Sequence, residues 1–163
     1  MGNLYIALLH YPMQNRRGKV VTTSMTSMDV HDIARTGKTY GAHQYYVITP
    51  MQTQREIARR LRGYWTEDER KRENSNRGEA LELVSVLDKL DEGILDIKDR
   101  EGTEPLLVGT SARDVGDRII SYGDAREKID DGERPVFVLF GTGWGMADEL
   151  VERMDYLLPP ING

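Results

Sequence analysis

The stretch that decides the fold is Pro135-Val-Phe-Val-Leu-Phe-Gly141-Thr-Gly143-Trp-Gly145-Met146, followed by Ala147-Asp-Glu-Leu-Val-Glu-Arg-Met154 and Asp155-Tyr-Leu-Leu-Pro-Pro-Ile-Asn-Gly163. An apolar strand runs into a glycine-rich turn, a short amphipathic helix follows, and a second apolar segment ends in another loop. Glycines directly after a strand allow positive φ angles and close approach of a ligand to the backbone. The pattern predicts a binding site made of main-chain amides and carbonyls, although the same glycines also suit a tight turn that serves only the fold.

The rest of the chain alternates short apolar runs with amphipathic segments. Apolar runs predict strands at 4–9, 44–49, 106–108 and 135–140. Helical spacing predicts helices over 29–40 (capped by Ser27 or Asp29), 53–61 (capped by Thr53), 81–90, 118–128 and 147–154, and the polar segment 66–78 is expected to be mobile. This order favours an α/β fold, a mostly parallel sheet with helices on both faces. Ligands of such sheets bind beyond the carboxyl ends of the strands, here at 109–113, 141–146 and 158–163.

Length and composition limit the class of protein. A chain of 163 residues, 39% hydrophobic and 30% charged, is most simply one globular domain over residues 1–163. No apolar run approaches the roughly 20 residues that cross a bilayer. With no cysteine, disulfides, thiolate metal sites and cysteine nucleophiles are excluded, and a cytoplasmic location is the default expectation.

The net charge of −5 conceals an asymmetry between the two halves of the chain. Residues 1–77 hold 13 Lys and Arg against 7 Asp and Glu, whereas residues 78–163 hold 9 against 20. A polyanion such as RNA would therefore meet the N-terminal half. An uneven but merely solvated surface explains the charges equally well.

Several common types of site are disfavoured. Gly141-x-Gly143-x-Gly145 does not match the dinucleotide fingerprint, and no Gly-Lys-Ser/Thr phosphate loop occurs. Asp29, His31 and Asp32 do not share one helical face, so no metal site is predicted. No Gly-x-Ser-x-Gly elbow supports a hydrolytic triad.

Three motifs carry a resemblance to a known family. Asp29-Val-His-Asp-Ile-Ala-Arg35-Thr-Gly-Lys-Thr-Tyr-Gly41-Ala resembles the first motif of the SPOUT (trefoil-knot) RNA methyltransferases. Val138-Leu-Phe-Gly141-Thr-Gly-Trp-Gly145-Met-Ala-Asp-Glu-Leu150 and Asp155-Tyr-Leu-Leu-Pro-Pro-Ile-x-Gly163 look like the second motif and its continuation. With Ala7-Leu-Leu-His10-Tyr-Pro12, the chain is similar to a bacterial subgroup of S-adenosylmethionine-dependent RNA methyltransferases.

The resemblance implies a trefoil-knot fold, S-adenosylmethionine as methyl donor with S-adenosylhomocysteine as product, an RNA substrate (tRNA or rRNA), and a homodimer without metal or membrane. Arg35 falls on the motif-one arginine that assists methyl transfer, and Asp29, which stands where many relatives have Asn, is either a base or a helix cap. The implied cofactor contacts are Gly109, Thr110, Ser111, Leu139, Gly141, Thr142, Gly143, Gly145, Met146, Leu158, Pro159, Ile161 and Gly163.

The proposed RNA contacts are six basic residues of the N-terminal half, namely Arg16, Arg17, Lys19, Arg55, Arg59 and Arg62. Relatives continue beyond the position of Gly163 with a segment that completes the knot, so we expect that a C-terminal tail has been cut or lost. The alternative function is a non-catalytic knot-fold module that binds RNA or protein. A plain nucleotide-binding α/β domain is a third interpretation, disfavoured by the missing phosphate loop.

Overall fold

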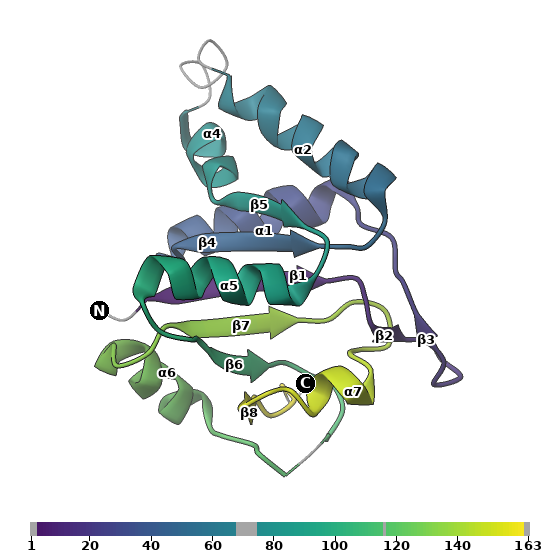
Figure 1. The fold of residues 1–163 in the computed structure, drawn as a ribbon, viewed down its shortest axis with the longest axis vertical. Coiled ribbons are helices and arrows are strands. Elements are labelled where there is room, and N and C mark those ends of the chain that lie inside the picture. Colours follow the sequence, from purple (N-terminus) through teal and green to yellow (C-terminus); the bar gives the residue numbers. More distant parts are fainter. Residues whose placement is uncertain (1–2, 68–74, 116, 162–163) are drawn as a thin grey trace.

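A computed structural model describes residues 3–67, 75–115 and 117–161. Its centre is a parallel sheet in the order β5-β4-β1-β7-β6-β8 (Figure 1). The strands are β1 (Leu4–Leu9), β4 (Gln44–Ile48), β5 (Val84–Leu87), β6 (Leu106–Gly109), β7 (Val136–Phe140) and β8 (Tyr156–Leu157). A separate antiparallel pair, β2 (Met13–Gln14) and β3 (Val20–Val21), forms the hairpin that carries the basic loop 15–19. The mostly parallel α/β sheet is therefore confirmed.

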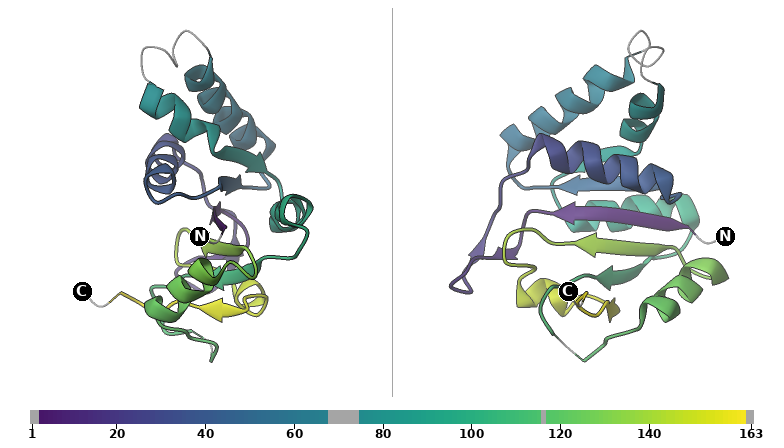
Figure 2. Two further views of the ribbon diagram at one scale, coloured as in Figure 1. Left: turned by 90° about the vertical axis from the view of Figure 1, so that its left-hand side faces the viewer. Right: turned by 180° about the vertical axis from the view of Figure 1, so that it is seen from behind.

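Helices cover both faces of the sheet, and α1 and α5 lie on opposite sides of it (Figure 2). The helices are α1 (Ser27–Thr39), α2 (Gln52–Thr66), α4 (Ser75–Glu82), α5 (Leu90–Glu101), α6 (Tyr122–Asp131) and α7 (Asp148–Val151). Side chains alternate between the faces along each strand. On β1, Ile6 and Leu8 pack with residues of α1, α2 and α4, while Tyr5, Ala7 and Leu9 pack with residues of α5 and α7.

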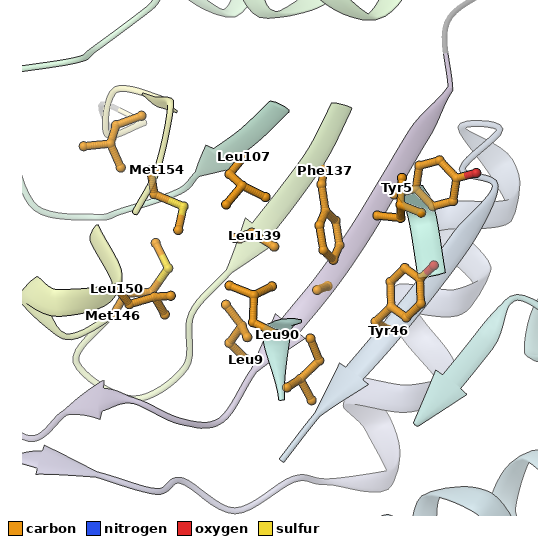
Figure 3. Packing of buried hydrophobic residues seen from close by; sticks show 14 of the residues in the cluster. Tyr5, Leu9, Tyr46, Leu90, Leu107, Phe137, Leu139, Met146, Leu150 and Met154 are labelled. Atoms are coloured by element: carbon orange, nitrogen blue, oxygen red, sulfur yellow. The ribbon is translucent and has the colours of Figure 1, made fainter. Parts of the chain in front are cut away.

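The second of these cores reaches the carboxyl ends of β6, β7 and β8. Figure 3 shows Met146, Leu150 and Met154 gathered beside Leu107 and Leu139. All five side chains are at least 92% buried. The glycine-rich turn and the two segments after it are therefore part of the packed core.

The sequence prediction differs from the structure in several elements, and the helix predicted over 147–154 is the shorter α7 (Asp148–Val151). The helix predicted over 81–90 is wrong: α4 ends at Glu82, the strand β5 follows, and α5 begins at Leu90. Leu81, Val84, Leu87 and Leu90 have helical spacing, but they belong to three successive elements. The helix predicted from residue 118 begins at Tyr122, capped by Ser121, and Thr53 does not cap α2, whose N-cap is Met51. Much of the segment 66–78, predicted to be mobile, lies outside the described residues.

Candidate functional site

Three loops meet at the carboxyl ends of β6, β7 and β8. These strands are neighbours in the sheet, so the loops that follow them reach the same edge. The amide of Thr110 donates to the carbonyl of Leu139 at 3.1 Å, and the amide of Leu158 donates to the carbonyl of Gly109 at 2.9 Å. The loops 109–113, 141–146 and 158–161, predicted separately from the sequence, therefore form one structural unit.

Two glycines of this unit are closely packed. A Cβ atom on Gly109 would lie 2.8 Å from Leu157 Cδ2 and 2.9 Å from Met154 Cγ. A Cβ atom on Gly141 would lie 3.0 Å from the side chain of Met146. The absence of side chains at these positions lets the backbone of the three loops lie against the methionine-rich core.

The glycine-rich turn is held by the β2–β3 hairpin. The amide of Gln14 donates to the carbonyl of Gly145 at 2.8 Å, and the amide of Trp144 donates back to Gln14 at 3.3 Å. Gly145 has φ +101°, a conformation that L side chains rarely adopt. The hydroxyl of Thr142 donates to the carbonyl of Leu9 at 3.0 Å and also contacts the hydroxyl of Thr23.

The sequence did not indicate this role of the hairpin. Met13 and Gln14 pair through their backbones with residues about 130 positions further along the chain. No local sequence pattern predicts such a contact. Met13 is fully buried, so its apolar character in an otherwise basic segment was the one available signal.

Backbone groups at the loops differ in their availability to a ligand. The carbonyl of Leu139 already accepts two hydrogen bonds, from the amide and the hydroxyl of Thr110. Within the described residues, the backbone amide of Gly141 has no backbone hydrogen-bond partner. The hydroxyl of Ser111 accepts the amide of Arg113 at 3.0 Å and keeps its own proton for another acceptor.

Two exposed apolar residues occur at this edge, Ile161 in the third loop and Phe140 at the end of β7. The carbonyl of Pro159 accepts the hydroxyl of Tyr122 at 2.9 Å. Ile161 is 84% exposed and Phe140 is 38% exposed. Uncharged donors and acceptors beside exposed apolar side chains fit a nucleoside-type cofactor. Gly163, also predicted to contact the cofactor, lies outside the described residues.

Arg35 and Asp29 lie on α1, apart from the loops. Arg35 is exposed and lines a shallow hollow with Asp32, Thr36 and Tyr40, and none of the three loops contributes to that hollow within the described residues. Asp29 is part of a capping box: its carboxylate accepts the amide of Thr26 at 2.8 Å, and its own amide donates to the Thr26 hydroxyl at 3.3 Å. The N-cap of α1 is therefore Thr26, neither Ser27 nor Asp29 as the sequence predicted, and Asp29 contributes to the cap from the third helical position. A catalytic role for either residue stays a prediction.

The six predicted RNA contacts fall into two separate groups. Arg16, Arg17 and Lys19 are exposed on the hairpin turn, which lies apart from α2 in Figures 1 and 2. On α2, Arg55 donates to the carbonyl of Thr49 at 2.9 Å and pairs with Asp88 at 3.4 Å.

Of the other two predicted contacts on α2, Arg59 is exposed and Arg62 is less so. Arg59 donates to the carbonyl of Val86 on the edge strand β5 at 3.3 Å. Arg62 is half-buried, and its Nε has no hydrogen-bond partner within the described residues. The hairpin group is therefore the more accessible of the two.

One histidine lies buried at the carboxyl end of β1. Burial lowers the pKa of His10, although the hydrogen bond from its Nδ1 to the carbonyl of Ile48, 3.2 Å long, acts in the opposite direction. That bond requires a proton on Nδ1, so Nε2 carries the lone pair of the neutral ring. His10 is therefore held neutral at pH 7.

The fold described above is similar to that of solved methyltransferase structures. A probable methylase family protein from Haemophilus influenzae Rd KW20 superposes with a TM-score of 0.61 at 20% identity, covering 99% of this chain and 55% of that chain. The SpoU methyltransferase AviRb from Streptomyces viridochromogenes, solved in complex with the cofactor AdoMet, gives a TM-score of 0.51 at 15% identity, covering 99% and 49%. The fold is that of the SPOUT methyltransferases.

Sequence comparisons give the family. A family model for SAM-dependent RNA methyltransferase matches residues 3–163. An uncharacterized protein from Aquifex aeolicus (strain VF5) is 41% identical over 161 residues, which cover 99% of this chain and 78% of that protein. The chain belongs to the SAM-dependent RNA methyltransferase family, an enzyme family whose cofactor is S-adenosylmethionine.

A further relative, named tRNA (guanine-N(1)-)-methyltransferase, comes from Oleidesulfovibrio alaskensis. It is 41% identical over 159 residues, which cover 98% of this chain but 36% of that protein. The chain thus spans little more than a third of that relative's length. Among the described residues, no helix is long and apolar enough to cross a membrane, and no cluster of three or more metal-ligating side chains occurs.

Proposed function

We propose that the protein binds S-adenosylmethionine at the loops 109–113, 141–146 and 158–161 and transfers its methyl group to a nucleotide of tRNA, with rRNA as the other candidate substrate. The observation that carries this proposal is the meeting of the three loops at one edge of the sheet, with Gly109 and Gly141 packed closely against neighbouring side chains. The relative named as a tRNA methyltransferase favours tRNA.

The residues of this chain contribute mainly position. When bound, the cofactor supplies an activated methyl group on a sulfonium centre. The backbone of Gly141 and the hydroxyl of Ser111 would hold it by uncharged hydrogen bonds, and Phe140 and Ile161 would shield it from water. Correct placement of donor and acceptor alone contributes several kcal/mol to such a reaction, about 7–11 in favourable cases.

RNA binding would rest on phosphate contacts. Arg16, Arg17 and Lys19 project from the hairpin whose strands hold the glycine-rich turn, so they lie near the cofactor loops. Their affinity for RNA would fall steeply with salt. The α2 arginines would add charge at a distance.

We also propose a homodimer that acts in the cytoplasm. Arg35 is exposed on α1 and does not reach the loops of its own chain within the described residues. A second copy could bring Arg35 to the loops, where its guanidinium would orient a phosphate or ribose of the RNA. Light scattering after size exclusion would give the oligomeric state, and a monomer would refute this part of the proposal.

The test combines cofactor binding with turnover. Calorimetry should give a micromolar Kd for S-adenosylmethionine, and labelled cofactor should transfer its methyl group to bulk tRNA. Gly141→Ala should weaken cofactor binding, because its Cβ would meet the Met146 side chain, whereas Gly63→Ala in α2 meets nothing within 4 Å and should not. Absence of cofactor binding would refute the methyltransferase proposal. Cofactor binding without transfer to tRNA or rRNA would favour the non-catalytic module.

A further inference from the structure

A second hollow opens at the same edge of the sheet, at the carboxyl ends of β1, β4 and β5. It is a cavity of about 320 Å³ between the start of α5 and α7. Its lining comes from five chain segments, and within the described residues none of the three cofactor loops contributes to it. It is nevertheless close to them, because the amide of Ala147, directly after the glycine-rich turn, donates to the carbonyl of Pro12 in its wall at 3.0 Å.

The walls of this cavity are mostly apolar. Pro12, Pro50, Leu90 and Leu150 line it together with Tyr11, which is 46% exposed. Ligand pockets in proteins span about 300–1,000 Å³, so this cavity is at the small end of the range. A space of this size beside an exposed aromatic ring suits one flat ring system, such as a single nucleobase, because every base has a face that stacks on aromatic side chains.

Three of the charged groups at the rim are held in ion pairs. Asp88 pairs with Arg55 at 3.4 Å, and Asp91 pairs with Arg153. Glu149 and Lys89 are the exceptions: within the described part of the chain neither side chain has a hydrogen-bond or ion-pair partner. One carboxylate at the mouth is therefore free to bind a ligand.

The chemistry of a free carboxylate selects among the bases. An ionised carboxylate only accepts hydrogen bonds, and it has two oxygens side by side. Guanine presents two adjacent donors, N1–H and the exocyclic amino group, and so can fill both oxygens. Adenine and cytosine present one amino group beside a ring acceptor, and uracil presents one N–H between two carbonyls. A bidentate, charge-assisted contact of this kind is both stronger and more specific than a single hydrogen bond.

We propose that this cavity binds one unstacked guanine base of the RNA substrate. Tyr11 stacks on the base, Glu149 accepts its two N–H groups, and the ammonium of Lys89, which also lines the cavity, faces the phosphate of the same nucleotide. This inference rests on the proposed function, because it assigns a recognition site for the RNA that the cofactor loops modify. Enzymes that act on nucleic acids commonly read a base after it has left the stack.

The test uses amide NMR spectra of the protein saturated with S-adenosylhomocysteine, titrated with GMP, AMP, CMP and UMP in turn. GMP should shift the amides of Leu90, Asp91 and Leu150, and the other three nucleotides should shift them less at equal concentration. Glu149→Gln should weaken GMP binding about tenfold or more, because it removes the charge of the acceptor and replaces one acceptor with a donor. Tyr11→Leu should weaken all four nucleotides together.

Glu152→Gln is the matched control, because Glu152 is exposed at the end of α7 and does not line the cavity. It should leave GMP binding unchanged. Equal shifts with all four nucleotides, no shift of the cavity amides, or equal losses in the two glutamate variants would overturn the base pocket. An arginine-rich peptide that shifts these amides where GMP does not would make the cavity a protein-binding site and would also overturn it.

The same spectra separate this inference from the proposed function. S-adenosylhomocysteine should shift the amides of Gly141 and Ser111 before any nucleotide is added. If it does and GMP leaves the cavity unchanged, the base pocket is wrong and the cofactor site stands. If it does not, the methyltransferase proposal fails, whatever the nucleotides do.

Discussion

Replacing Gly109 by alanine tests whether the cofactor loops depend on close packing. Gly109 ends β6 and does not have a positive φ angle, so alanine suits its backbone. The added Cβ would lie 2.8 Å from Leu157 Cδ2, 2.9 Å from Met154 Cγ and 3.1 Å from Met146 Cε. These three side chains are at least 98% buried, so none of them can move into solvent to make room.

The expected effect is a net loss of stability. Overpacking a buried site costs about 1–3 kcal/mol. Losing the flexibility of glycine in the unfolded chain offsets about 0.4–1 kcal/mol of that cost. We therefore expect Gly109→Ala to lower the free energy of unfolding by about 1–2 kcal/mol, which in a domain of this size lowers Tm by about 2–4 °C per kcal/mol. Because Leu157 and Met146 adjoin two of the cofactor loops, binding of S-adenosylmethionine should weaken as well.

Urea denaturation of wild type, Gly109→Ala and Gly63→Ala measures this effect. Gly63 lies within α2, where a Cβ would meet nothing within 4 Å, so alanine there should stabilise the protein by about 0.5–1 kcal/mol. The same substitution would thus lower the free energy of unfolding at position 109 and raise it at position 63. A Gly109→Ala protein as stable as wild type would refute the reasoning, because the core would then have space for the added Cβ atom.

Three further predictions concern other parts of the molecule. Changing Arg16 and Arg17 to glutamine should reduce the slope of log K against log salt for RNA binding by about 1.4–1.8, measured by fluorescence anisotropy; an unchanged slope would place the phosphates elsewhere. Burial lowers the pKa of His10, so the unfolded chain binds a proton at this imidazole more readily than the folded protein does. The free energy of unfolding should therefore be highest above pH 6.5 and fall below it, and the fall should be less steep in His10→Gln. Urea midpoints that change with pH equally in the two proteins would contradict this. Thr26→Ala removes the cap of α1 and should cost about 1 kcal/mol in urea denaturation, whereas Thr22→Ala should cost little; equal losses would argue against the capping box.

The sequence predicted best the elements whose pattern is local. The apolar runs at 4–9, 44–49 and 135–140 are strands within one residue at each end, because each is flanked by residues that stop a strand. The strand β5 was missed because Val84 and Leu87 keep the three-residue spacing of a helix. Helices pack on both faces of this strand, so each of its four residues is at least half-buried. The sequence alone does not show these helices to be its neighbours.

The site shows the same division between local and distant information. Glycines after β6 and β7 predicted the loops, and the parallel order of the strands predicted that these would share an edge. The hydrogen bonds of Gln14 with Gly145 and Trp144 could not be predicted, because they join segments far apart in the sequence. The capping role of Asp29 was one of two interpretations that the sequence left open, and only the position of Thr26 distinguishes them.

The position of β1 in the sheet has a consequence for synthesis on the ribosome. β1 lies between β4 and β7, and Leu4 pairs with Val136. While the chain is being made, β4 emerges soon after β1, but the other side of β1 remains an open edge with unpaired amides and carbonyls until β7 leaves the exit tunnel. Such an edge favours pairing with other chains. The protein should therefore be most prone to aggregate as a nascent chain that carries β1, β4 and β5 but not yet β7.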